Sequence, residues 1–163
     1  MGKSGRTPSY FLVKSEESVY SIADLERDTT TRWEGVRNYQ ARNLMKDEMR
    51  EGDLVLFYHS SSDPSGVAGL ARVAGVALPD PSQFDRKSPY YDAASTQSEP
   101  RWWLVELVFV ERLPQVLPLA ALKADRALEA MLVTRKGQRL SVQPVAKEHF
   151  CRVLELAKAK TRV

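Results

Sequence analysis

The sequence predicts an α+β fold in which a mixed, curved sheet or pseudo-barrel of about five to six strands is flanked by helices. Strand-like apolar stretches alternate irregularly with helical patterns, and two of these stretches are separated only by a hairpin-length turn. Such an order of elements is typical of α+β domains. The 163 residues fit one domain, since a chain of this length buries roughly 68–70% of its unfolded surface.

Five stretches have the apolar, branched and aromatic composition of β-strands. The first covers residues 10–13. A strand at 53–59 is followed, after a polar turn, by a small-residue strand at 66–76. A third strong strand is expected at 102–110 and a short one at 140–142.

Two helices are expected in the first third of the chain. The first begins at Ser21, because a serine followed three residues later by an acid is typical of a helix start. A longer helix is expected at 38–50, where Met45 and Met49 continue a four-residue apolar spacing. Gly52 should end this helix, since glycine is common just after helix termini.

The last third of the chain is expected to be mostly helical. Pro114 and Pro118 should bracket a connection out of the third strong strand. Residues 119–132 predict one or two short helices, and residues 147–158 an amphipathic terminal helix.

We expect one folded domain at residues 10–158, with a flexible tail at 1–9 and a short tail at 159–163. A long segment at 78–100 contains four prolines and no apolar period. Loops of that length inside a compact domain are usually functional or mobile. We therefore expect this loop either to gate a binding pocket or to dock a partner protein.

The charge distribution is weakly informative about partners. The net charge is +3 and the sequence pI about 9.0. Residues 1–50 carry nine basic and eight acidic side chains, residues 51–100 three and seven, and residues 101–163 twelve and six. Any basic face must therefore combine the two ends of the chain, which favours an anionic partner only weakly.

Several classes of site and location are disfavoured by composition. Cys151 is the only cysteine, and the histidines are His59 and His149, so neither a disulfide nor a metal site is expected, and no cofactor is indicated. No run of about 18 apolar residues indicates a membrane-spanning helix. We expect a reducing compartment: the cytoplasm, or the nucleus in a eukaryote. A monomer is the simplest expectation.

Signals for catalysis are poor. The sequence contains neither a Gly-rich phosphate loop nor a Gly-x-Ser-x-Gly elbow. His59 and Ser60 are adjacent on an expected strand, so their side chains should point to opposite faces and cannot pair. A histidine bonded within the fold is a better interpretation of His59 than a catalytic base.

Residues 32–43 have the composition of a nucleic-acid contact. This segment holds three arginines, two asparagines, one glutamine, one tryptophan and one tyrosine. Amides match base edges, aromatic faces stack on bases, and arginines bind phosphates. A helix start with a solvated basic face and one core tryptophan is an equally good interpretation.

Several strings of the sequence resemble the EVE domain family. They include Tyr-Phe-Leu-Val-Lys-Ser-Glu at 10–16, Trp-Glu-Gly-Val-Arg-Asn-Tyr-Gln-Ala-Arg-Asn at 33–43, and Gly-Val-Ala-Gly at 66–69. The resemblance continues through Arg-Leu-Ser-Val-Gln-Pro at 139–144 and covers about residues 10–157. One departure is Glu17, which stands where proline usually follows Lys-Ser-Glu.

The resemblance implies a PUA-like fold and kinship with YTH, ASCH and SRA domains, which recognise modified bases in RNA or DNA. It implies a non-catalytic module that binds a modified base, including modified cytosine, in an aromatic and amide pocket. It does not distinguish DNA from RNA.

The resemblance also suggests residue roles. The implied base pocket comprises Lys14, Ser15, Trp33, Asn38, Tyr39, Gln40, Asn43, Ser60, Tyr91, Trp102, Ser141 and Gln143, with Tyr90 as an alternative wall. The implied phosphate contacts are Arg37, Arg42, Lys46, Arg101 and Arg139. The alternative function is a small enzyme or binding protein that acts on a free nucleoside or metabolite in the same pocket.

Overall fold

One curled sheet of six strands forms the centre of the fold. The computed structural model describes residues 7–137 and 139–163. The strand order is β2-β7-β4-β3-β1-β8. These strands are β1 (Tyr10–Glu16), β2 (Thr30–Arg32), β3 (Leu54–Ser60), β4 (Gly66–Val73), β7 (Glu106–Pro118) and β8 (Val142–Val145). The pair β1–β3 is parallel and the other pairs are antiparallel, so the sheet is mixed, as the sequence predicted.

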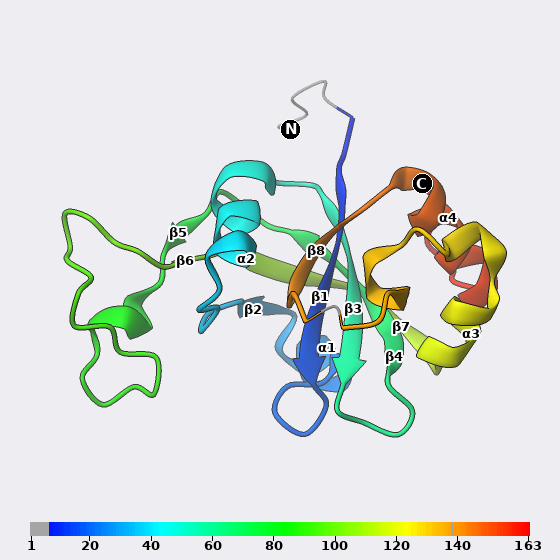
Figure 1. The fold of residues 1–163 in the computed structure, drawn as a ribbon, viewed down its shortest axis with the longest axis horizontal. Coiled ribbons are helices and arrows are strands. Elements are labelled where there is room, and N and C mark those ends of the chain that lie inside the picture. The colour runs from blue at the N-terminus through cyan, green and yellow to red at the C-terminus, as the bar shows by residue number, and fades with distance from the viewer. Residues whose placement is uncertain (1–6, 138) are drawn as a thin grey trace.

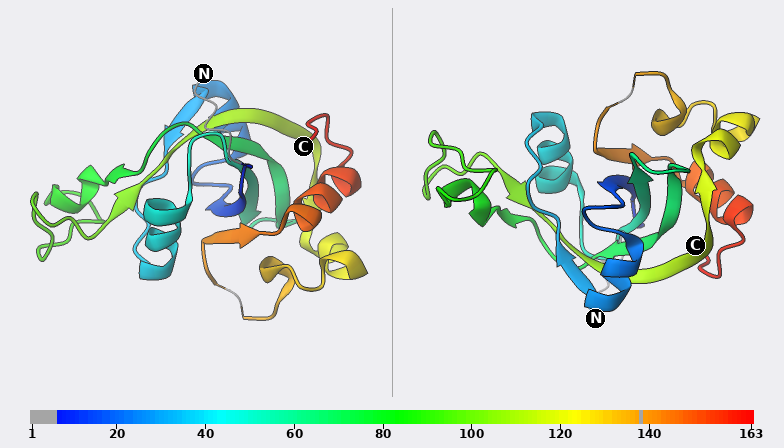
Figure 2. Two further views of the ribbon diagram at one scale, coloured as in Figure 1. Left: turned by 90° about the horizontal axis from the view of Figure 1, so that it is seen from above. Right: turned by 90° about the horizontal axis from the view of Figure 1, so that it is seen from below.

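The sheet curls into a half-barrel with helices at its sides (Figures 1 and 2). The α-helices are α1 (Ile22–Asp28), α2 (Tyr39–Asn43), α3 (Leu119–Ala124) and α4 (Lys147–Ala157). Shorter turns are η1 (Leu44–Glu48), η2 (Pro81–Phe84), η3 (Arg126–Leu128) and η4 (Leu132–Thr134). The strand β7 arches from the region of α2 to that of α3 and α4 (Figure 2).

Side-chain alternation along the strands divides the core between the two faces of the sheet. Phe11 and Phe57 belong to the cluster that includes the apolar residues of α1, α2 and η1. Leu12 and Tyr58, their neighbours in sequence, belong to the cluster that includes α4. The face bearing Phe11 and Phe57 is the one on which the candidate site lies.

An arm projects from the half-barrel at the left of Figure 1. Its base is the two-stranded ribbon of β5 (Leu78–Pro79) and β6 (Trp103–Leu104). The segment between them is the proline-rich loop expected from the sequence. This loop has little regular secondary structure apart from the 3-10 turn η2.

Local signals predicted α1 correctly. The Ser21 side chain accepts a hydrogen bond from the backbone N–H of Asp24, and the Asp24 side chain accepts one from the backbone N–H of Ser21. This reciprocal pair satisfies two amides at the helix start.

The helix expected at 38–50 is shorter than predicted. The α-helix ends at Asn43 and continues as a π-helical turn to Glu48. Gly52 does not terminate it. Gly52 lies in the following turn at φ 93°, and its N–H donates to the carbonyl of Val73. The positive φ explains the glycine there.

The expectation that Pro114 and Pro118 bracket a connection is wrong, because β7 runs through both to Pro118. The pairing of β7 with β4 shifts register between the pairs Val67–Leu117 and Gly69–Arg112. Pro114 therefore falls in an irregularity where no ladder hydrogen bond to β4 is lost.

The C-terminal segment is packed against β7. The Glu111 carboxylate accepts hydrogen bonds from the backbone N–H groups of Lys160 and Thr161 and from the Thr161 hydroxyl. Ala159 is buried. Of the expected N-terminal tail, residues 1–6 lie outside the described residues.

Candidate functional site

A cavity of about 610 Å³ opens where β1 ends. Residues from the segments 14–20 and 31–37 line it, together with Tyr90 and Ser141. These residues come from distant parts of the sequence, and the sheet brings them together. β1 lies beside the edge strand β8, β2 forms the opposite edge, and the curl of the sheet turns the two edges toward each other (Figure 2).

Trp33 forms a fixed wall of this cavity. It follows β2 directly, and its backbone N–H donates to the carbonyl of Val105 at 2.8 Å. Its ring contacts Phe57 edge-on, with 5.5 Å between centroids and an interplanar angle of 80°. The indole is only partly buried, so it is anchored on the core and still borders the cavity.

Ser15 and Lys14 border the cavity in different ways. The Ser15 hydroxyl donates to the carbonyl of Tyr20 at 2.6 Å and so fixes the turn that follows β1. The Lys14 ammonium lies 5.8 Å from the ring centroid of Tyr58, which belongs to the opposite face of the sheet from Trp33. Burial lowers the pKa of Lys14.

Tyr90 forms the wall contributed by the arm. Gly35 has φ 82°, and a Cβ there would lie 2.8 Å from the Tyr90 ring. Glycine therefore lets the ring lie directly on the backbone. The Arg37 guanidinium lies 5.3 Å from the Tyr90 ring and 5.2 Å from the Trp102 ring, and it donates to the Tyr90 carbonyl at 2.8 Å.

Asp80 joins the arm to the segment that carries Trp33. This fully buried carboxylate accepts hydrogen bonds from the backbone N–H of Gly35 at 2.8 Å and from Arg37 at 3.1 Å. Burial alone would raise the pKa of Asp80. The hydrogen bonds from Ser82, Gly35 and Arg37 outweigh burial and hold the pKa below its usual value.

The loop at 78–100 is held by further hydrogen bonds. The buried Gln83 side chain donates to the carbonyl of Trp102 at 2.8 Å and accepts from its backbone N–H at 3.0 Å. The indole N–H of Trp102 donates to Asp92 at 2.7 Å. These contacts favour a preformed wall over a loop that orders only around ligand.

Five of the expected pocket and phosphate residues border the cavity: Lys14, Ser15, Trp33, Arg37 and Ser141. Tyr90 does so as well, whereas Tyr91 does not. Trp102 is buried between Arg37 and Tyr39 and lies outside the lining. Gln143 is buried and donates to the carbonyl of Leu140.

The amide-rich start of α2 serves the helix itself. The Asn38 side chain accepts from the backbone N–H of Ala41 at 3.0 Å and caps the helix. The Asn43 side chain accepts from Arg42. Gln40 is exposed, and Ser60 lies at the end of β3, both outside the cavity lining. Arg139 is exposed before β8 and also lies outside the lining.

Other lining residues were not singled out from the sequence: Glu16, Val19, Tyr20, Thr31, Arg32, Glu34, Gly35 and Val36. Three of them, Glu16, Arg32 and Glu34, directly flank the predicted residues Ser15 and Trp33. The sequence signal that could have identified these three residues is their position directly beside a predicted residue at a strand end.

His59 is bonded within the fold. Its Nε2 accepts from the backbone N–H of Ile22 at 3.1 Å, and its Nδ1 has no hydrogen-bond partner among the described residues. The ring is buried, and burial lowers its pKa below the usual 6.5. Because its Nε2 accepts from a backbone amide, the ring is held in its neutral form.

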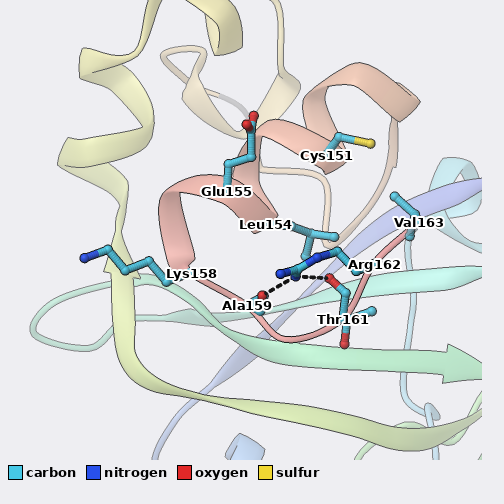
Figure 3. A pocket seen from close by; sticks show the side chains of 8 residues that line it. All are labelled: Cys151, Leu154, Glu155, Lys158, Ala159, Thr161, Arg162 and Val163. Atoms are coloured by element: carbon cyan, nitrogen blue, oxygen red, sulfur yellow. Dashed lines mark hydrogen bonds between the residues drawn. The ribbon is translucent and has the colours of Figure 1, made fainter.

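A second hollow of about 430 Å³ lies between α4 and the C-terminal segment (Figure 3). Arg162 lines this hollow and donates hydrogen bonds to the carbonyls of Ala159 and Thr161. No residue expected from the sequence to bind a ligand lines it. Among residues 7–137 and 139–163, no three potential ligand side chains gather as a metal site would require. No helix in this described part is long and apolar enough to cross a membrane.

Three of the strings that resembled a known family, at 10–16, 33–43 and 139–144, contribute residues to the cavity lining, and comparison with known proteins identifies that family. The EVE domain family model matches residues 9–156. The chain belongs to the EVE domain family. Its half-barrel of mixed strands is the PUA-like fold that this membership implies.

Human thymocyte nuclear protein 1 is 40% identical to this EVE domain over 160 residues, which cover 91% of the chain and 70% of the human protein. The chicken protein of the same name is 38% identical, and the alignment covers 66% of its length. The EVE domain thus spans about two thirds of the curated relatives it matches.

Solved structures of similar proteins share the fold over more than nine tenths of this chain. A protein from Pseudomonas syringae superposes with a TM-score of 0.88 at 43% identity, covering 91% of this chain and 99% of that one. Human THYN1 protein, solved in complex with DNA containing 5-methylcytosine, superposes with a TM-score of 0.84 at 38% identity, covering 94% and 99%.

We predict that His59 makes the stability of this EVE domain depend on pH. In the unfolded chain the histidine binds a proton near pH 6.5, whereas the buried ring stays neutral because its pKa is lowered. Protonation thus favours unfolding, and the free energy of unfolding should fall below pH 6.5 by up to about 1.4 kcal/mol per pH unit. Urea titrations at pH 7.5 and 5.5 measure this. The His59→Gln variant should lose the His59 share of the drop, and an unchanged drop would contradict the assignment.

We predict that Asp80→Asn destabilises the fold and loosens the arm. The substitution removes the charge that pairs with Arg37 and leaves a buried donor poorly satisfied, a loss of about 1–3 kcal/mol. Thermal or urea unfolding measures the loss, and hydrogen exchange at residues 78–102 reports the loosening. Glu26→Gln is the matched control, because its ion pair with Arg112 is about half exposed and should contribute little. Equal effects of the two variants would contradict the role of Asp80.

Proposed function

We propose that this EVE domain is a non-catalytic reader of modified bases in DNA, with 5-methylcytosine as the base that enters the cavity beside Trp33. The observation that carries the proposal is the half-buried indole of Trp33, which is anchored on Phe57 and borders a cavity lined in part by residues of the strings that resemble the family. The relative solved with DNA containing 5-methylcytosine supports the choice of ligand.

The cavity has the features that a single cytosine requires. Trp33 and Tyr90 provide aromatic surface, and stacking of a base on such surface contributes about 1–3 kcal/mol. Glu16 and Glu34 provide carboxylates, which accept hydrogen bonds from the exocyclic amine of cytosine. Val19 and Val36 provide apolar surface for a 5-methyl group.

A base in duplex DNA reaches this cavity only when it leaves the stack. Flipping costs a few kcal/mol and exposes the base edge to hydrogen bonds. Asp80 and Arg37 already hold the cavity walls in place. Ordering of the protein therefore adds little to the free-energy cost of base flipping.

The chemistry of the lining residues supports a reader over an enzyme. The Ser15 hydroxyl donates to the Tyr20 carbonyl, and the nearest histidine on the sheet, His59, accepts from Ile22. A nucleophile needs an adjacent base to be activated. A protein that binds a free nucleoside or metabolite is the competing outcome of the test below. A DNA reader has to share a compartment with DNA, which in a eukaryote is the nucleus.

We predict that Trp33→Ala abolishes discrimination between methylated and unmethylated DNA. Loss of stacking worth about 1–3 kcal/mol corresponds to roughly 5- to 150-fold weaker binding of the methylated duplex. Fluorescence anisotropy with two duplexes that differ by one 5-methyl group measures the affinity ratio. Circular dichroism checks that the variant is folded.

Tyr91→Ala is the matched control, because Tyr91 is an exposed aromatic residue of the arm that lies outside the cavity lining. It should retain the affinity ratio. If Trp33→Ala is folded and retains the ratio as well, Trp33 is not the stacking wall. If the wild type binds free 5-methyl-2′-deoxycytidine but neither duplex, the metabolite alternative replaces the DNA reader.

A further inference from the structure

A row of aromatic and cationic side chains leads away from the cavity along α2 and the arm. We name Tyr39, Arg42, Lys46, Arg101 and Trp103 the cation–aromatic strip. The Arg42 guanidinium lies 4.8 Å from the Tyr39 ring centroid, and the Lys46 ammonium lies 5.5 Å from the Trp103 ring centroid. Arg42 also donates to the carbonyl of Arg101 at 2.7 Å, which ties the helix to the arm.

The strip is continuous with the cavity. Arg37 borders the cavity and lies against Trp102, and the Trp102 ring stacks on Tyr39 with 4.8 Å between centroids and an interplanar angle of 22°. Of the five cation–ring contacts among the described residues, four lie along this path. A strand that leaves the cavity on the Arg37 side therefore meets the strip next.

The strip is accessible, and its cations form no ion pairs among the described residues. Tyr39 is 50% exposed, and Lys46 and Arg101 are exposed. Within residues 7–137 and 139–163, no carboxylate forms an ion pair with Arg42, Lys46 or Arg101. Elsewhere Arg27, Arg112 and Arg152 do form such pairs.

A hollow of about 410 Å³ extends the strip beyond Lys46. Arg50 and Trp103 are among the residues that line it, and so is Asp47. Asp47 and Glu48 are on the same turn as Lys46, so acidic residues flank this end of the strip.

We propose that the cation–aromatic strip binds the phosphodiester backbone of the DNA strand whose base occupies the cavity. This inference rests on the proposed function. Phosphates pair with Arg42, Lys46 and Arg101, and the exposed side of the Tyr39 and Arg42 stack contacts the neighbouring nucleotide. Arg37 has a different role, because its charge is paired with the Asp80 carboxylate and it therefore positions the cavity wall, whereas Arg42 donates to the neutral acceptors of Asn43 and Arg101.

The test uses the double variant Arg42→Gln/Lys46→Gln and a matched control, Lys123→Gln/Arg126→Gln. The control removes two exposed cations from α3 and η3, on the opposite side of the molecule from α2 (Figure 1). Affinity for a duplex with one 5-methylcytosine, and for the same duplex without it, is measured by anisotropy between about 0.05 and 0.3 M salt.

The double variant should bind both duplexes more weakly by the same factor, roughly 10- to 60-fold near 0.1 M salt. The slope of log affinity against log salt should fall in magnitude by about 1.8, since each lost phosphate contact removes about 0.9. The control should keep the wild-type slope. Lys46→Gln alone leaves the Arg42–Arg101 hydrogen bond in place and should lose about 0.9 of slope.

Equal slopes of log affinity against log salt for wild type, double variant and control would overturn the proposal that the strip binds phosphates. Loss of methyl discrimination in the double variant would also overturn it, because backbone contacts carry no information about the base. If the wild type shows no methyl discrimination, the proposed function fails while the slopes still decide whether the strip binds phosphates. If the wild type binds neither duplex, both proposals fail.

Discussion

The cavity depends on one ion pair, between the buried Asp80 in the arm and the partly buried Arg37 beside Trp33. A buried carboxylate is tolerated only when its hydrogen-bonding capacity is satisfied. Here the donors are Arg37 and the backbone amides of Gly35 and Ser82. Because these donors belong to segments about 45 positions apart in sequence, satisfying Asp80 forces the arm onto the segment that holds the cavity.

The same pair determines how two aromatic rings lie. The Arg37 guanidinium that pairs with Asp80 also lies against Tyr90 and Trp102. Tyr90 is thereby held against Gly35 and becomes a wall, while Trp102 becomes the support for Tyr39. One ion pair thus connects the base cavity with the cation–aromatic strip. A protein whose walls are held in this way pays little conformational entropy when a ligand enters.

Residue types alone did not separate ligand contacts from internal contacts. Trp33, Ser15 and Ser141 were expected at the pocket from the family resemblance, and they border the cavity. Asn38 has the same chemistry as a base-reading amide, yet its side chain caps α2. An amide or a guanidinium binds a backbone group as readily as a base or a phosphate, so only the positions of its neighbours decide which it meets.

The sequence by itself determined the elements whose signals are local. The apolar runs specified the central strands, and the Ser21–Asp24 pair specified the start of α1, because these interactions lie within a few residues of one another. The tertiary structure alone decided that Tyr90 borders the cavity and that β7 continues past Pro114. Both outcomes depend on pairing between distant segments, Gly35 with Asp80 and β4 with β7, and such pairing leaves no periodic pattern in the sequence.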